Sequence, residues 1–257
     1  MKLRLLAFLG GLMCVLVLGA AEPVSPAPAA APVLVSVHGA WAGGWQMKKV
    51  APLLEAKGWK VYRPTLSGLG EHFNTASPDI GLATHIDDIV NFILFEDLHD
   101  VILLGHSYGG MVVTGVADRI PERIRKVVYL DAFVPNNGES VVSLRKPGGL
   151  DIEAMTKDGF VVPSWVKPDK LPPKDVPQPY KTFADLIVLH NQATTAKIPT
   201  VFILTVDPGK KPEDDEFFAS SERIRQRGGP VLTMLDTDHV PNWHKPEALA
   251  DLLLHLP

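Results

Sequence analysis

Short apolar runs alternate with amphipathic segments along most of the chain. Six runs are brief and rich in aliphatic and β-branched residues, so each predicts a buried strand. They cover residues 33–37, 59–62, 101–104, 125–130, 199–205 and 231–235. Among the segments between them, Ile86, Ile89, Val90 and Ile93 give the clearest helical stripe. A first helix is predicted by the apolar positions between 47 and 54 and ends at Gly58, and a later helix is predicted over residues 213–227. Strands separated by helices predict an α/β fold with a mostly parallel six-stranded sheet and helices on both faces.

The alternation breaks over residues 136–191, which are rich in proline and show only weak helical patches. Regular alternation resumes with the strand predicted at 199–205. A long irregular segment inside a compact domain is commonly functional. We therefore expect a small cap insertion that lies over the carboxyl edge of the sheet, rather than a second domain.

Residues 1–21 have the composition of a secretory signal peptide. Lys2 and Arg4 form a basic start, residues 5–18 form an apolar core that is short for a membrane span, and small residues follow. Residues 22–32 form a linker rich in proline and alanine, which leaves residues 33–257 for the folded domain. We expect a periplasmic or secreted protein, and an uncleaved membrane anchor is the alternative.

Composition narrows the function classes. The 257 residues carry a net charge of −4 with acidic and basic residues interspersed, so nothing indicates a nucleic-acid interface. The single cysteine, Cys14, lies in the predicted signal peptide. The mature chain would then have no thiol nucleophile, no thiolate metal site and no disulfide.

The sequence Gly105-His106-Ser107-Tyr108-Gly109 connects a predicted strand to an apolar segment that continues as a buried helix. This is the context in which the pattern G-x-S-x-G forms a nucleophile elbow. Glycine is required on either side of the serine because a Cβ would collide with the neighbouring strand or helix. The motif predicts Ser107 as a nucleophile above the sheet edge.

A serine nucleophile needs a histidine base, and the base needs an acid that orients it. In a sheet of this kind both partners follow later strands, the acid before the histidine. His239 follows the last predicted strand and is the expected base. Asp207 follows the strand at 199–205 and is the preferred acid. The alternatives are Asp214 and Asp215, further along the same loop, and Asp131, at the end of the strand at 125–130.

Two backbone N–H groups are needed to hold the oxyanion of a tetrahedral intermediate. The residue after the nucleophile, Tyr108, should supply one of them. The glycine-rich turn after the first strand should supply the other, and Ala40 is the best placed residue in that turn.

Several motifs together resemble the group of small bacterial EstC-like esterases, plant methylesterases and hydroxynitrile lyases within the α/β-hydrolase superfamily. They are the turn at 38–41, the loop at 64–71, the serine motif at 105–111 and the stretch at 129–135. The resemblance implies an α/β-hydrolase fold and no cofactor, with Ser107 and His239 catalytic and Ala40 and Tyr108 as oxyanion donors. We also expect no metal site. The lyases carry lysine and threonine where this chain has Val240 and Gly39, which favours ester hydrolysis.

These observations lead us to expect a serine carboxylesterase for small to medium esters. The expected pocket walls are Trp41, Phe133 and Trp243. A lactonase or carbon–carbon hydrolase would use the same residues, and a hydroxynitrile lyase or a silent ligand-binding homologue is a further alternative. The expected partner is a small ester, with no nucleic acid, no stable membrane anchoring, and a monomer or homodimer.

Overall fold

The computed structural model describes residues 31–257. The predicted signal peptide, Cys14 and residues 22–30 of the predicted linker lie outside the described residues. Within residues 31–257, no helix combines the length and apolar character that a membrane span requires.

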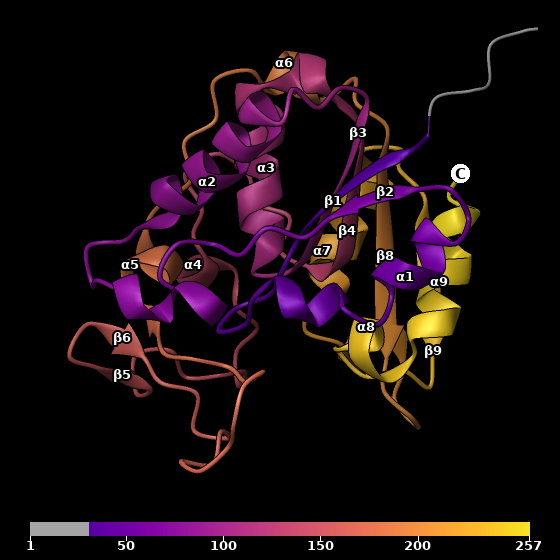
Figure 1. Cartoon of the computed structure of the whole chain (residues 1–257). Coiled ribbons are helices and arrows are strands. Elements are labelled where there is room, and N and C mark those ends of the chain that lie inside the picture. Colours follow the sequence, from indigo (N-terminus) through magenta and orange to yellow (C-terminus); the bar gives the residue numbers. More distant parts are fainter. Residues whose placement is uncertain (1–30) are drawn as a thin grey trace, which may run out of the picture. The chain divides into compact units, whose positions relative to one another are not determined.

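Six parallel strands form the main sheet, which confirms the prediction from the apolar runs (Figure 1). Across the sheet their order is β2–β1–β3–β4–β8–β9. The strands are β1 (Val33–Val37), β2 (Lys60–Tyr62), β3 (Val101–Ser107), β4 (Ile124–Ala132), β8 (Thr200–Val206) and β9 (Val231–Leu235). The chain goes from β1 outward to β2 and then returns to the other side of β1 with β3. This reversal of strand order opens a crevice at the carboxyl ends of β1 and β3, the position where open α/β sheets bind ligands.

Helices cover both faces of the sheet because successive strand residues point to opposite sides. In β3, Val101 and Leu103 pack into the core beneath α2 and α3, whereas Ile102 and Leu104 pack against α1 and α9. Helix α7 packs on the same face of the sheet as α2 and α3. The bounds of these helices are α1 (Ala51–Glu55), α2 (Leu82–Phe95), α3 (Gly109–Arg119), α7 (Phe218–Gln226) and α9 (Pro246–Leu254).

The segment predicted as a cap contains short elements and a small second sheet (Figure 1). The elements are α4 (Val141–Leu144), β5 (Thr156–Lys157), β6 (Phe160–Val161), β7 (Gln178–Pro179) and α5 (Lys181–Ala184), followed by α6 (Gln192–Thr195). The three strands pair antiparallel in the order β5–β6–β7. Each has only two residues, which is too short for a periodic pattern in the sequence to predict it.

Two predicted helices differ from the observed ones near the sheet edge. The helix predicted over residues 213–227 begins only at Phe218, after a 3₁₀ turn at Pro212–Asp214. The Asp215 carboxylate accepts the Phe217 N–H at 2.7 Å, which turns the chain before the helix starts. The first predicted helix divides into a 3₁₀ turn at Gly44–Met47 and α1. Further 3₁₀ turns lie at Gly70–Thr75 and Pro121–Arg123, and α8 spans Pro241–His244.

Candidate active site

Ser107 is the last residue of β3, and α3 begins two residues later at Gly109. Its φ angle is 55°, in the left-handed region that a serine adopts only when the surroundings impose it. A Cβ on Gly105 would lie 2.6 Å from the Gly109 carbonyl oxygen, and one on Gly109 would lie 2.7 Å from the Val37 carbonyl oxygen. The two glycines therefore permit the close approach of β1, β3 and α3 that the sharp turn needs.

His239 lies between the serine and a buried carboxylate. Its Nε2 is 2.9 Å from the Ser107 hydroxyl oxygen, and its Nδ1 is 2.7 Å from Oδ2 of Asp131. Because the carboxylate only accepts, Nδ1 carries the proton and Nε2 is free to accept the serine hydroxyl proton. The structure thus brings together the two side chains that the sequence selects as nucleophile and base.

Asp131, and not Asp207, lies against His239, which corrects the preferred assignment of the acid. Register between β3 and β4 slips at this point, since His106 pairs with Leu130 but Ser107 pairs with Ala132. Asp131 is the extra residue of this β-bulge, with a φ angle of 44°. Its side chain is fully buried, and its Oδ1 accepts the Thr205 N–H at 3.0 Å while Oδ2 faces the histidine. Both carboxylate oxygens are therefore held in place.

Asp207 turns away from His239 because the chain reverses immediately after β8. Lys210 N–H donates to the Asp207 carbonyl oxygen at 3.1 Å, and the Lys210 ammonium pairs with the Asp207 carboxylate at 2.8 Å. The Asp207 side chain remains 42 % exposed at the rim of the cavity. Asp214, another alternative, accepts the Lys211 N–H at 3.0 Å and also lies outside the contact with the histidine.

Charges around His239 set its protonation behaviour. Desolvation alone lowers the pKa of His239, but the hydrogen bond and charge of Asp131 outweigh it and raise the pKa above its ordinary value. Asp215 and Glu216 act in the same direction from the loop before α7. Burial, together with the charge of Asp131, raises the pKa of Asp215 to about 6. Asp215 therefore belongs to the electrostatic surroundings of the histidine without a direct hydrogen bond to it.

The rings of Phe217 and His106 both pack against the imidazole of His239. The Phe217 ring stacks on it with centroids 5.0 Å apart and an interplanar angle of 8°, and the His106 ring lies 4.7 Å away. Burial lowers the pKa of His106 to about 3, so it is neutral and does not add a charge beside the base. Its Nε2 donates to the His239 carbonyl oxygen at 2.7 Å. Sequence reasoning missed Phe217, because its position follows from the irregular turn before α7.

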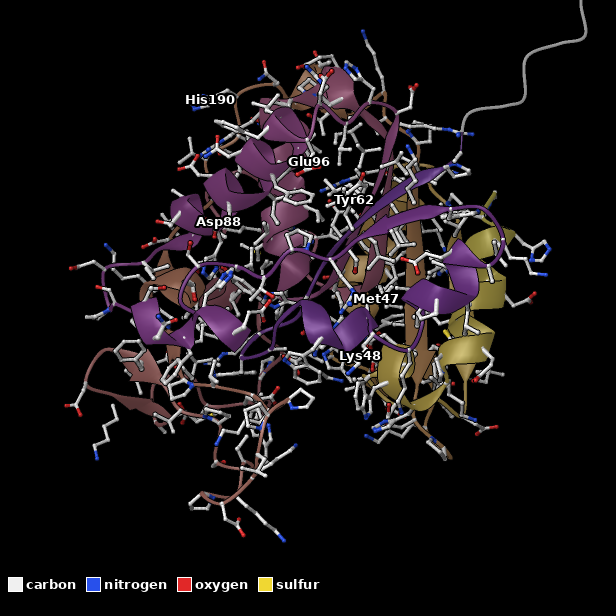
Figure 2. The ribbon with its side chains drawn as sticks, viewed as in Figure 1. Met47, Lys48, Tyr62, Asp88, Glu96 and His190 are labelled. Carbon is white, nitrogen blue, oxygen red and sulfur yellow. The ribbon has the colours of Figure 1, made fainter. Side chains whose placement is uncertain are left out.

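The two predicted oxyanion donors border the nucleophile. Neither the Ala40 N–H nor the Tyr108 N–H has an acceptor among residues 31–257, and both residues line the cavity beside Ser107. Tyr108 is buried, and its hydroxyl donates to Nδ1 of His85 at 2.8 Å. His85 in turn donates from Nε2 to the Ser67 carbonyl oxygen at 3.0 Å. The carboxylate of Asp88 on α2, labelled in Figure 2, accepts hydrogen bonds from the N–H and the hydroxyl of Ser67. The residue that follows the nucleophile is thus anchored through α2.

A cavity of about 670 Å³ opens at Ser107 between the sheet edge and the cap. Trp41 and Phe133 line it, as the sequence predicts. Trp243 is not among the lining residues, which corrects the third expected wall. Pro241 opens α8, and this helix places the Trp243 ring edge-on against Trp45, 5.6 Å between centroids. Cap residues and the loop before α7 complete the wall, and they include Val141, Leu150, Ile152, Trp165, Phe183 and Phe217.

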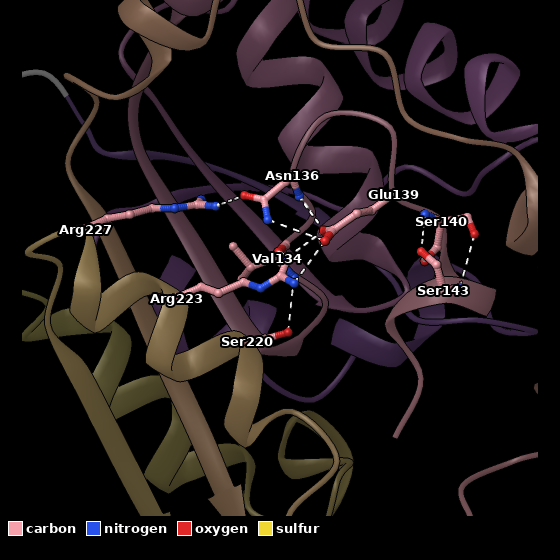
Figure 3. A network of polar contacts seen from close by, with 8 residues as sticks. All are labelled: Val134, Asn136, Glu139, Ser140, Ser143, Ser220, Arg223 and Arg227. Atoms are coloured by element: carbon pink, nitrogen blue, oxygen red, sulfur yellow. Dashed lines mark hydrogen bonds and ion pairs between the residues drawn. The ribbon is translucent and has the colours of Figure 1, made fainter. Parts of the chain in front are cut away.

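A polar network joins α7 to the segment that follows β4 (Figure 3). These two segments adjoin Phe133 and Phe217, which line the cavity. Arg223 on α7 donates to the Val134 carbonyl oxygen at 3.0 Å and to Oε1 of Glu139 at 3.0 Å. The Val134 N–H donates to the Ser220 hydroxyl at 3.3 Å. Because these bonds join α7 to the segment after β4, they fix the two phenylalanines relative to each other, with ring centroids 4.9 Å apart. Among residues 31–257, no three His, Cys, Asp or Glu side chains are grouped to hold a metal ion.

Known proteins are similar to this chain over part or most of its length. A carbendazim-hydrolysing esterase from Nocardioides sp. is 52 % identical over 110 residues, 43 % of this chain and 46 % of that protein. Methylesterase 1 of Arabidopsis thaliana is 28 % identical over 86 % of this chain and 94 % of its own. An extracellular α/β-hydrolase from a Paenibacillus species superposes with a TM-score of 0.71 at 22 % identity, over 87 % of this chain and 98 % of that one. The Alpha/beta hydrolase family matches residues 34–252, and the chain belongs to that family.

Proposed function

We propose that this chain is a serine carboxylesterase that cleaves small to medium esters through an acyl-enzyme intermediate. The observation that carries the proposal is the continuous hydrogen-bonded series Ser107–His239–Asp131 at the base of a cavity. Such a series converts a weakly nucleophilic hydroxyl into an attacking group.

In the proposed reaction the Ser107 oxygen attacks the ester carbonyl carbon, and its proton passes to Nε2 of His239. The buried Asp131 carboxylate stabilises the imidazolium and keeps its ring oriented. The N–H groups of Ala40 and Tyr108 hold the negative oxygen of the tetrahedral intermediate. His239 then gives the proton to the leaving alcohol. A water molecule then attacks the acyl carbonyl carbon as His239 takes one of its protons. When the acyl bond to Ser107 breaks, His239 returns this proton to the Ser107 oxygen and the acid is released.

The similar proteins support ester hydrolysis as the reaction type. One is named for hydrolysis of carbendazim, and another is named a methylesterase. A cavity of about 670 Å³ lies within the range that holds small-molecule ligands. The apolar and aromatic groups of its wall can enclose an apolar or aromatic portion of the ester, and charged residues such as Arg145, Asp207 and Lys210 line the same cavity.

Export forms part of the proposal and rests on the sequence of residues 1–21 alone. A periplasmic or secreted location would put the enzyme in contact with extracellular esters. Expression of the full chain in a Gram-negative host, followed by fractionation and N-terminal sequencing, tests it. Activity in the periplasm with a new N-terminus near Ala21 supports export and cleavage, whereas full-length protein retained in the cytoplasm contradicts both.

The central experiment compares wild type with Ser107→Ala on p-nitrophenyl acetate, butyrate and octanoate and on methyl benzoate. We expect at least a 10³-fold loss of kcat in the variant, because the oxyanion hole and binding groups alone give limited catalysis. Ser77→Ala, outside the cavity lining, is the matched control and should keep wild-type rates. Phenylmethylsulfonyl fluoride should label wild type on Ser107, as seen by peptide mass. Full activity of Ser107→Ala would overturn the proposal.

A further inference from the structure

The backbone turn that carries Ala40 is held by the cap. Trp41, the next residue, has a φ angle of 62°, a conformation that is a genuine outlier for a bulky side chain. Its N–H donates to Oε1 of Gln178 at 2.7 Å, and its carbonyl oxygen accepts the Val176 N–H at 2.8 Å. Its indole N–H donates to the Val161 carbonyl oxygen at 3.0 Å. All three polar groups of this strained residue are therefore bonded to the cap.

Gln178 is built into the cap in one orientation. The side chain is fully buried on β7, and its Nε2 donates to the Thr182 hydroxyl oxygen at 2.8 Å. Thr182 uses its own proton to donate to the Pro179 carbonyl oxygen at 2.7 Å, so its oxygen is available as an acceptor. This arrangement turns the oxygen of the Gln178 amide toward the Trp41 N–H.

A second glutamine holds the other side of the same turn. The N–H of Gly39 donates to Oε1 of Gln46 at 3.0 Å. The amides before and after Ala40 are thus both bonded to glutamine oxygens, while the Ala40 N–H has no acceptor among residues 31–257. Among the amides of residues 39–41, only that of Ala40 is left without an acceptor, and Ala40 lines the cavity.

The cap also contacts the second oxyanion donor. The ring of Phe183, on α5, lies 5.4 Å from the Trp41 ring and 5.7 Å from the Tyr108 ring, measured between centroids. Phe183 and Gln178 are five positions apart in the sequence. A short piece of the cap therefore packs against the residues that supply or border both oxyanion donors.

We propose that Gln178 is a positioning residue for the oxyanion hole, so that the cap fixes the geometry of catalysis in addition to enclosing the substrate. The inference rests on the proposed function of Ser107 and its partners. Without the Gln178 acceptor, the strained Trp41 backbone relaxes and the Ala40 N–H moves from the place where the oxyanion forms. The transition state loses stabilisation while the ground-state ester keeps its apolar contacts.

The test is Gln178→Met, which keeps the length of the side chain and removes the acceptor, together with Gln178→Asn, which keeps the amide but is one methylene shorter. Loss of one complete oxyanion donor costs about 10²–10³ in kcat, and displacement of a donor should cost about 10- to 100-fold. We expect this loss in kcat for p-nitrophenyl butyrate with KM changed by less than about threefold. Gln226→Met, on the exposed end of α7, is the matched control and should match wild type.

Phenylboronic acid supplies a readout that a purely structural role would not move. Its tetrahedral adduct with Ser107 places a negative oxygen in the oxyanion hole, so its affinity should weaken by the same factor as kcat. Benzoate, which forms no adduct, should bind the variants as it binds wild type. Wild-type kcat and boronate affinity in folded Gln178→Met or Gln178→Asn would overturn the inference. The proposed function is tested separately by Ser107→Ala, whose activity does not depend on this result.

Discussion

Replacement of Asp131 by asparagine tests the assignment of the acid most directly. In the native site, Oδ1 of Asp131 accepts the Thr205 N–H at 3.0 Å and Oδ2 faces Nδ1 of His239 at 2.7 Å. The asparagine oxygen must stay with the Thr205 N–H, so its NH₂ group must face His239. An NH₂ donor there requires Nδ1 without a proton, which moves the proton to Nε2. The proton then points at Ser107, and the histidine no longer serves as its base.

A wrong histidine tautomer of this kind lowers kcat by about 10⁴-fold in a serine hydrolase, or about 5 kcal/mol of transition-state stabilisation. We expect a loss of that size for Asp131→Asn in the hydrolysis of p-nitrophenyl acetate. The matched control is Asp207→Asn, which removes only the exposed pair with Lys210. A surface pair of this type contributes about 0–1 kcal/mol to stability, so the variant should stay folded. Its kcat should stay near wild type because the Asp207 carboxylate pairs with Lys210 and not with His239.

Circular dichroism and thermal unfolding should accompany both rate measurements, because Asp131 is fully buried and its replacement also perturbs the fold. A folded Asp131→Asn protein with kcat within tenfold of wild type would refute the reasoning. A loss of 10³-fold or more in Asp207→Asn would return the acid to the loop after β8.

Three further predictions follow. The raised pKa of His239 places the acid limb of kcat/KM above pH 6.5, with activity lost as pH falls because the protonated ring is no base; a midpoint below 6 in a pH–rate profile would contradict this. Gly110→Ala should destabilise the fold by about 3 kcal/mol in urea unfolding, since its Cβ would lie 2.1 Å from the Phe133 carbonyl oxygen. Gly58→Ala, with φ 85° and open space, should cost only about 1–2 kcal/mol, and equal losses would argue against a steric cause. Asp118→Ala should also destabilise by about 1–3 kcal/mol, because this buried carboxylate accepts two N–H groups before α6, and an unchanged midpoint would show that they find other acceptors.

The amino-acid sequence by itself determines the sheet and two of the three members of the candidate triad. The strands are short uninterrupted apolar runs, and burial on both faces imposes that pattern wherever a parallel strand forms. Ser107 is recognisable because the elbow is local: glycine must occupy positions 105 and 109 for β3, β1 and α3 to approach. His239 is recognisable because it lies in the loop that follows the last strand, which ends at Leu235.

The tertiary structure alone decides the remaining features, because each depends on contacts between distant segments. Asp131 comes to face His239 through a β-bulge that one extra residue in β4 creates against β3. The composition of neither strand predicts this bulge. Trp243 leaves the cavity because α8 directs it to Trp45. The bond between Gln178 and the Trp41 N–H joins positions 137 residues apart. Hydrophobic periodicity predicts which face of a helix or strand is buried. It does not predict which residue of a distant loop or of the cap will contact that face.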